Sequence, residues 1–376
     1  MAASMFLMAL GEELWKRFVP KYLEALGAPI TAIGLYGTTR DLFNGLAQYP
    51  GGWFADRYGR RRALTLFVAM ATLGYAFYLV APTWTFVFYG LVFVMAWTSM
   101  ASPTLFAVIG DALPRERRAM AFSVQSILRR IPVIFAPTIG GLLITSFGVI
   151  WGVRVGLIAT ILLACATLLV IGRINVVHVE QQERIGIWGV WQSLPKSFRL
   201  LLASDVFIRA AEAMVEVLLV LYAINIIGVS PAQFGLLIAI QTVTAILSYL
   251  PGARLADHTG RKPFVMITFV AFTMFPVAVA LAPNFGWLVI AYLIAGLREI
   301  GEPARKALIV DLAEPHLRAR SAGLYQLVRS VWIAPSAAVG ALLWRVSPPL
   351  PFLFAGVIGL IGTIVFALTV KEEHAG

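Results

Sequence analysis

Long apolar segments, each about the length of a membrane-crossing helix, follow one another along almost the whole chain. We place about twelve of them, near residues 4–27, 30–54, 63–81, 84–110, 119–146, 150–172, 200–227, 231–255, 263–282, 285–311, 319–345 and 349–370. A helix needs roughly 20 apolar residues to cross the hydrocarbon core of a bilayer. Short turns such as Ala81-Pro82-Thr83 and Ala282-Pro283-Asn284 separate several of the segments. The pattern predicts an all-α polytopic membrane protein.

Composition supports a membrane protein and removes one alternative. The 376 residues are 60% hydrophobic, and the mean hydropathy is +0.84, which is too apolar for an ordinary soluble chain. A net charge of +11 would suggest a nucleic-acid partner in a soluble protein. Here the basic residues gather in alternate loops, so we expect a multi-pass protein of the inner or plasma membrane and no nucleic-acid partner. All four histidines lie in loops or the tail, so no metal or other cofactor is expected.

The arginines and lysines predict the orientation of the chain. Basic residues cluster in four loops that alternate with loops almost free of positive charge, where Arg345 is the main exception. The clusters are Arg57 with Arg60, Arg61 and Arg62; Arg115 with Arg117 and Arg118; Arg261 with Lys262; and Arg318 with Arg320. Loops rich in lysine and arginine stay on the cytoplasmic side. We therefore expect both termini in the cytoplasm.

One turn occurs twice in the chain. Residues 50–62 read PGGWFADRYGRRR, and residues 251–262 read PGARLADHTGRK, with matched positions 201 residues apart, as in Gly59 and Gly260. Two halves of six helices that both start from the cytoplasm would be parallel repeats. We expect a bundle over 1–172, a cytoplasmic linker over 173–198 whose residues 187–191 lie along the inner interface, and a second bundle over 199–376.

This doubled turn resembles the signature loop of the major facilitator superfamily, G-x-L-A-D-R-x-G-R-[KR], with departures at Phe54, Ala253 and His258. The resemblance implies twelve helices in two pseudo-symmetric halves, and gating roles for the loop. The residues concerned are Gly52, Asp56, Arg57, Gly59, Arg60, Asp257, Gly260 and Arg261. It also implies that the third, sixth, ninth and twelfth helices face lipid. Those four segments carry almost no charge.

Two further motifs of the family are incomplete. The stretch Ala136-Pro137-Thr138-Ile139-Gly140-Gly141 resembles the antiporter motif of drug/proton exchangers, although close packing of small residues explains it equally well. The arginine that the family places in the fourth helix is missing between Leu91 and Met100. Arg298 in the tenth segment is its nearest analogue.

Ionisable residues within the apolar segments are the candidates for function. Each costs about 2.5–3.5 kcal/mol to insert, so each should face a cavity or a partner. Asp205, Arg209, Glu212 and Glu216 follow one another at spacings of four, three and four, which places them on one stripe of a helix. The candidates for proton coupling are Glu12, Glu13, Glu212, Glu216 and Glu302. The candidates for substrate binding are Lys16, Arg17, Arg40, Asp41, Arg129, Arg209, Arg298 and Arg305.

Some of these charges have a purely structural interpretation. Glu12 with Lys16, and Glu13 with Arg17, have the spacing of self-neutralised pairs within one helix. A pair between helices, such as Asp41 with Arg329, would lock one conformation.

The functional hypothesis is a monomeric secondary transporter that moves a small amphiphilic or charged organic solute by alternating access, with proton-coupled efflux as the expected mode. Uptake or facilitated passage of an organic anion is an alternative, and so is lipid flipping. A receptor or scaffold without transport is the alternative from a different class. No nucleophile–base constellation or cofactor loop indicates an enzyme.

Overall fold

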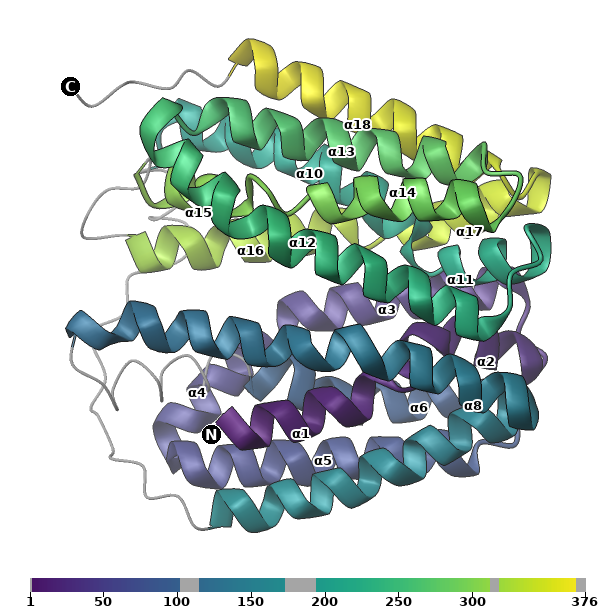
Figure 1. Cartoon of the computed structure of the whole chain (residues 1–376). Coiled ribbons are helices and arrows are strands. Elements are labelled where there is room, and N and C mark those ends of the chain that lie inside the picture. Colours follow the sequence, from purple (N-terminus) through teal and green to yellow (C-terminus); the bar gives the residue numbers. More distant parts are fainter. Residues whose placement is uncertain (1, 102–114, 173–193, 312–317, 370–376) are drawn as a thin grey trace. The chain divides into compact units, whose positions relative to one another are not determined.

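The computed structural model describes residues 2–101, 115–172, 194–311 and 318–369, and these residues form helices joined by short turns (Figure 1). The chain divides into two compact units. The first contains Met1–Gln182 and Ser230–Ala239, and the second contains Glu183–Val229 and Ile240–Gly376. Most of the predicted linker, residues 173–193, lies outside the described part, and its last residues already belong to a helix that begins at Lys196.

The first unit is built on one long helical segment that contacts several shorter helices. Its elements are α1 (Ala2–Glu13), η1 (Lys16–Phe18), α2 (Val19–Ala25), α3 (Ile30–Leu46), α4 (Gln48–Tyr58), α5 (Arg60–Val80), α6 (Trp84–Met95), η2 (Ala96–Met100) and α8 (Arg115–Gly172). The backbone reverses at Gly148, which has φ +77° inside α8, so α8 contains two helices. Helix α8 packs against α1 and α5 (Figure 1).

The second unit is organised around α10, which packs against α13, α16, α17 and α18 (Figure 1). Its elements are α10 (Lys196–Glu216), α11 (Leu219–Leu221), η3 (Tyr222–Ile226), α12 (Pro231–Thr259), α13 (Lys262–Ala280), α14 (Phe285–Leu297), α15 (Glu302–Asp311), α16 (Arg318–Ile333), α17 (Ser336–Val346) and α18 (Leu350–Thr369). The first residues of α12 are grouped with the other unit.

Six helical segments are long and apolar enough to cross a membrane among the residues that the structure describes. They are Arg60–Val80, Arg130–Gly172, Pro231–Tyr249, Lys262–Ala280, Leu324–Val346 and Leu350–Thr369. Helix is present in each of the twelve segments predicted from the sequence. Several of these segments are divided into shorter helices, as the segment 4–27 is divided into α1, η1 and α2. Each of the shorter helices is too short to cross a membrane alone.

The duplicated turn is shorter than the sequence suggested. Helix α4 continues to Tyr58 and α5 begins at Arg60, so Gly59 alone reverses the chain with φ +90°. Gly260 has φ +98° at the matching position. A Cβ atom disfavours this region of backbone space, which explains glycine at both positions. Gly27 and Gly228, also 201 residues apart, have φ +85° and +82°, which supports a duplicated fold.

Contacts around the two turns are repeated as well. A Cβ on Gly51 would lie 2.5 Å from the backbone of Met100, and one on Gly252 would lie 2.3 Å from the carbonyl oxygen of Ile300. Both glycines therefore allow their helix to approach a neighbouring segment closely.

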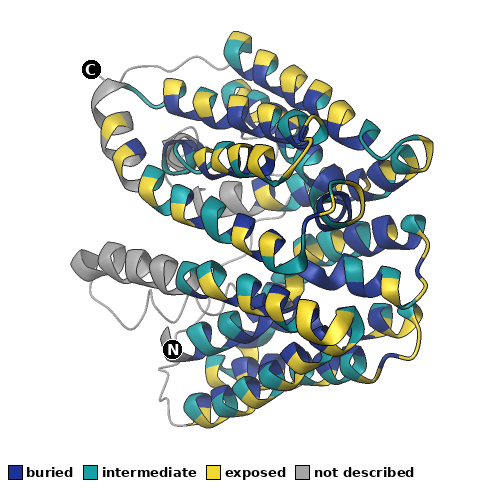
Figure 2. Ribbon diagram, turned by 45° about the vertical axis from the view of Figure 1, so that its right-hand side comes forward, coloured by how far each residue is buried: buried dark blue, intermediate teal, exposed yellow. Residues whose placement is uncertain are grey.

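Large apolar side chains are exposed on most of the described helices, and the third, sixth, ninth and twelfth predicted segments, which the resemblance places toward lipid, are among them. The exposed side chains of these four segments include Leu66, Leu73 and Val80 on α5; Trp151, Val155, Ile158, Leu162 and Leu169 on the second part of α8; Ile267, Val270 and Met274 on α13; and Leu353, Val357, Leu360, Ile364 and Leu368 on α18. Figure 2 shows exposed positions recurring along the helices next to buried ones. Stripes of this size are unfavourable in water, so they support contact with acyl chains.

Candidate functional site

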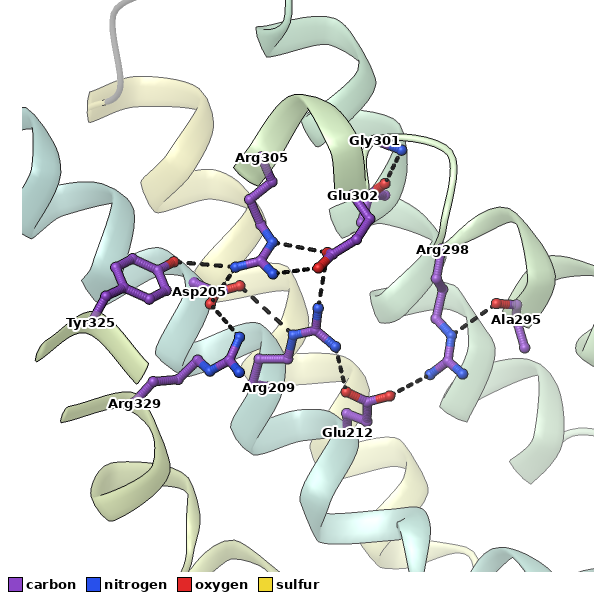
Figure 3. A network of polar contacts seen from close by, with 11 residues as sticks. Asp205, Arg209, Glu212, Ala295, Arg298, Gly301, Glu302, Arg305, Tyr325 and Arg329 are labelled. Carbon is purple, nitrogen blue, oxygen red and sulfur yellow. Dashed lines mark hydrogen bonds and ion pairs between the residues drawn. The ribbon is translucent and has the colours of Figure 1, made fainter. Parts of the chain in front are cut away.

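Seven ionic side chains of the second unit form a continuous set of contacts, which we call the ionic network (Figure 3). Its members are Asp205, Arg209 and Glu212 on α10, Arg298 at the end of α14, Glu302 and Arg305 on α15, and Arg329 on α16. Four guanidinium groups therefore meet three carboxylates. An ionised group at membrane depth needs such partners, because the hydrocarbon offers no water to replace them.

Asp205 is the most buried carboxylate of the network, with 1% of its side chain exposed. Its Oδ2 accepts hydrogen bonds from Nη1 of Arg305 at 3.0 Å and from Nη1 of Arg329 at 3.4 Å. Nε of Arg209 lies 3.8 Å from Oδ1. Arg305 also donates to the hydroxyl of Tyr325 at 3.4 Å. Asp205 thus holds together side chains from α10, α15 and α16.

Glu302 fixes the two arginines that face it. Arg305 donates to it through Nη2 at 2.7 Å and through Nε at 3.0 Å, each to a different carboxylate oxygen. Arg209 donates to Oε2 of Glu302 at 3.2 Å. Because paired donors restrict orientation, Glu302 determines where the guanidinium plane of Arg305 lies.

Glu212 lies at the more open end of the network and connects two arginines. Its Oε2 accepts from Arg209 at 3.0 Å and its Oε1 accepts from Arg298 at 3.2 Å. Both guanidinium carbons lie 4.7 Å from the ring centre of Phe272. Arg298 also lies 4.9 Å from Phe275. Cations are attracted to the face of an aromatic ring, so α13 supplies an aromatic support for both arginines.

The network includes a break in the tenth predicted segment. Helix α14 ends at Leu297 and α15 begins at Glu302. Arg298 donates through Nε to the carbonyl oxygen of Ala295 at 2.9 Å, at the C-terminal end of α14. Glu302 stands in the first turn of α15. These positions suit the partial charges of helix ends, which are negative at the C-terminus and positive at the N-terminus.

Contacts with α13 fix this break. The N–H of Gly301 donates to Oγ1 of Thr268 at 2.8 Å. A Cβ on Gly301 would lie 2.1 Å from the carbonyl oxygen of Phe264, so only glycine fits here without a shift of the backbone.

Five of the predicted candidates are brought together in this network, namely Arg209, Glu212, Arg298, Glu302 and Arg305. Glu216 is the last residue of α10 and is not among the residues that Figure 3 labels. The candidate sets did not include Asp205 and Arg329. A signal for Asp205 was present, because it precedes Arg209 by four residues on the same stripe.

In the first unit, the predicted helix breaks at the charged residues. Helix α1 ends at Glu13 and η1 begins at Lys16, so Glu12 and Lys16 are not one regular turn apart. Glu12 is buried and accepts a hydrogen bond from Tyr75 at 2.6 Å, whereas Lys16 is exposed. The second predicted pair does form, with Nε of Arg17 at 3.3 Å from Glu13.

Other candidates of the first unit lie apart from these. Arg40 pairs with its neighbour Asp41 at 2.9 Å. Arg329, which we considered as a partner of Asp41, contacts Asp205 instead. The side chain of Arg129 lies outside the described residues.

The structure describes the side chains of only some of the signature-loop candidates. The side chains of Asp56 and Asp257 lie outside the described residues. Arg57 is exposed, with its guanidinium 5.5 Å from the ring of Trp53. Gly52 lies within α4, Arg60 begins α5, and Arg261 directly precedes α13.

Two basic residues of the loop clusters, Arg61 and Lys262, occupy matching positions in the two repeats and make helix-end contacts that the sequence analysis did not predict. Arg61 donates to the carbonyl oxygen of Gly172 at the end of α8, and Lys262 donates to the carbonyl oxygen of Ala367 at 2.9 Å, near the end of α18. Cations are favourable at helix C-termini. The common offset of 201 residues was the signal that could have identified this pair.

Among the described residues, the long apolar helices, the exposed apolar stripes and the internal ionic network are the features of a multi-pass membrane protein. The family model described as Major Facilitator Superfamily matches residues 1–214 and again 201–376. The chain therefore belongs to the major facilitator superfamily, whose members are transporters.

Curated relatives match parts of the chain. The Quinolone resistance protein NorA of Staphylococcus aureus is 24% identical over 147 residues, which are 39% of this chain and 38% of that protein. The MFS-type transporter YqjV of Bacillus subtilis (strain 168) is 28% identical over 185 residues, 49% of this chain and 45% of that protein. The chain thus matches less than half the length of each of these relatives.

Solved structures share the fold at low identity. A nucleoside transporter, NupG, has a TM-score of 0.82 at 13% identity, and the match covers 98% of each chain. A POT family transporter in complex with a thioalcohol-conjugated peptide has a TM-score of 0.82 at 14% identity, covering 99% of this chain and 96% of that one. At these identities the likeness concerns the fold alone.

Proposed function

We propose that this protein is a secondary transporter that moves a small organic solute by alternating access, and that the ionic network is its coupling and binding site. The observation that carries the proposal is the convergence of Arg209, Glu212 and Glu302, from two helices, on one set of contacts. Such groups are costly inside a membrane, and when they are present there they mark pathways for substrates and ions.

The proposed arrangement has twelve transmembrane helices, cytoplasmic termini and two six-helix bundles over 1–172 and 199–376, joined by a linker over 173–198. Support comes from the repeated turns at Gly59 and Gly260 and from the apolar stripes on α5, α8, α13 and α18. We place the protein in the inner or plasma membrane as a monomer.

Protons are the proposed coupling ion. A carboxylate couples transport to protons when its burial and its charged neighbours change between conformations. We assign this role to Glu212 and Glu302, because both pair with Arg209 and a movement of Arg209 would change the charged neighbours of each. Glu12, buried against Tyr75, is a second candidate position, with Glu13 and Glu216 as further ones. Efflux is the proposed direction, in line with the resistance protein NorA among the relatives.

A flux measurement tests this proposal. The full-length protein would be reconstituted in liposomes, and a panel that includes a fluorescent quinolone would be followed with and without an imposed pH gradient. We expect a gradient-dependent flux that Glu212→Gln, Glu216→Gln or Glu302→Gln uncouples. Glu24→Gln, which alters the pair with Lys21 outside the network, is the matched control and should retain coupling. No solute flux under any gradient would contradict transport and favour a receptor or scaffold.

Movement of an organic anion is the second candidate function. It is favoured by the four guanidinium groups that face three carboxylates in the network. In this case the solute and the proton would move in the same direction, so the sign of the gradient's effect separates the two candidates. A lipid with an anionic headgroup is a special case of the same chemistry.

A further inference from the structure

We propose that Arg209 and Arg298 bind a carboxylate of the transported solute, and that this carboxylate takes the place of the side chain of Glu212. The inference rests on the proposed transport function and adds to it the chemical class of the solute, an organic acid with an apolar or aromatic body. The residues concerned all lie within the second unit.

The geometry of Glu212 is the geometry that a solute carboxylate would adopt. One oxygen accepts from Arg209 at 3.0 Å and the other accepts from Arg298 at 3.2 Å. Two guanidinium groups that approach the two oxygens of one carboxylate form charge-assisted hydrogen bonds with defined geometry. Glu212 therefore occupies a site that is complementary to a free carboxylate of similar size.

Glu212 is also the carboxylate of the network that a solute can replace most easily. Its side chain is 28% exposed, compared with 12% for Glu302 and 1% for Asp205. It takes no part in the contacts of Arg305 and Arg329, which depend on Asp205 and Glu302. A solute that displaces Glu212 leaves the deeper half of the network intact.

The balance of charge selects an anion. With Glu212 in place, the network has one more guanidinium group than carboxylates. When Glu212 turns away, Arg209 retains Glu302 as a partner, while Arg298 loses the carboxylate that it contacts. An uncompensated guanidinium in a partly buried site is unfavourable. An incoming carboxylate restores the pairing, whereas a cationic solute would add to the positive charge.

The arginines are held in place before a solute arrives. The ring centre of Phe272 lies 4.7 Å from the guanidinium carbons of both Arg209 and Arg298. Nε of Arg298 donates a hydrogen bond to the carbonyl oxygen of Ala295. Phe275 contributes a second ring beside Arg298. Donors that are oriented in advance lose little freedom on binding. The same rings offer an apolar surface to the body of the solute.

The test is a binding measurement on the purified full-length protein in detergent micelles, with 1-naphthoate as the probe. The neutral probe 1-naphthamide and the cationic probe 1-naphthylmethylamine have the same ring system and control for partition into the micelle. We expect naphthoate to bind about tenfold more tightly than the amide. Arg298→Gln should remove that preference. Glu212→Gln should raise the affinity for naphthoate about tenfold, because the charged competitor is gone.

Arg345→Gln is the matched control, since Arg345 lies on α17 away from the network, and it should bind naphthoate like the wild type. Size-exclusion profiles show whether each variant is folded. If Arg298→Gln does not fold, Arg298→Lys, which keeps the charge but loses the fork of donors, should weaken naphthoate binding and thereby replace it as the test.

Two results would overturn the inference. One is equal affinity for naphthoate and naphthamide in both the wild type and Glu212→Gln. The other is a Glu212→Gln variant that binds naphthoate no more tightly than the wild type does. These outcomes are distinct from a failure of the proposed function, because binding is measured in micelles and transport in liposomes.

Discussion

At the scale of single residues, Asp205 is the side chain on which the ionic network depends. It lies within reach of three guanidinium groups, those of Arg209, Arg305 and Arg329, and only 1% of its side chain is exposed. Removing one partner of a buried ion pair is strongly destabilising, because the remaining charge keeps its desolvation cost and loses its compensation. Asp205 therefore stabilises the network. The more exposed Glu212 is the residue to which we assign a role in transport.

This difference gives a prediction for stability. Asp205→Asn keeps the shape of the side chain but leaves Arg305 and Arg329 with an uncharged partner, so we expect the free energy of unfolding to fall by about 3–5 kcal/mol. Chemical unfolding in micelles, followed by tryptophan fluorescence, measures it. Glu24→Gln is the control, since the pair of Glu24 with Lys21 is more open to solvent and should contribute less than about 1 kcal/mol. If Asp205→Asn lowers the free energy of unfolding no more than the control does, Asp205 does not stabilise the network as proposed.

The candidates chosen from the sequence include five of the seven residues of the network, but the sequence could predict only part of how they pair. The spacing of Arg209 and Glu212 placed both on one stripe of a helix, and they are in contact. It could not predict that Glu12 would bond to Tyr75 across 63 positions of the chain. Nor could it predict that Arg329 would pair with Asp205. Contacts between helices depend on packing, which a local pattern does not encode.

At the scale of elements, the most informative feature is the break between α14 and α15. We predicted one continuous helix over 285–311, and the structure shows two, with Arg298 and Glu302 on either side of the break. The sequence did contain a signal: Pro303 has no N–H to donate to the carbonyl oxygen four residues earlier, so it interrupts a continuous helix but is tolerated in the first turn of a new one. The break turns both charged side chains toward α10.

The break should be sensitive to a single methyl group. In Gly301→Ala the new Cβ would lie 2.1 Å from the carbonyl oxygen of Phe264, so α13 and α15 must move apart. We expect lower thermal stability, with a loss of about 1–3 kcal/mol, and a flux reduced in parallel. The control is Gly286→Ala, where the Cβ would make an ordinary contact at 3.4 Å. Unchanged melting temperature and flux in Gly301→Ala would show that the close approach is not required.

At the scale of the whole molecule, the two repeats share their turns and the charges beside those turns, but not the charges of the ionic network. Positive-φ glycines recur at Gly27 and Gly228 and at Gly59 and Gly260. The positions that correspond to Asp205, Arg209 and Glu212 in the first repeat are Ser4, Met8 and Gly11. The duplication was visible from the sequence because turns need particular residues. The same comparison of positions 201 residues apart shows how the two repeats differ. Among the described residues, the ionic network belongs to the second repeat alone.

The arrangement of the repeats in the membrane gives a last prediction. The basic cluster at the start of α5 should stay in the cytoplasm, so α5 should carry the chain to the outer side by residue 83. In a Cys165→Ser background, cysteines at Arg62 and Thr83, both exposed positions at the two ends of α5, report the topology. A membrane-impermeant maleimide applied to intact cells should label Thr83→Cys, and should label Arg62→Cys only after permeabilisation. Labelling of both in intact cells would mean that α5 does not cross the membrane. Labelling of Arg62→Cys but not Thr83→Cys in intact cells would mean that the molecule is inverted in the membrane. The basic residues around Gly59 and Gly260 would then face outward, and the charge asymmetry of the loops would have no physical cause.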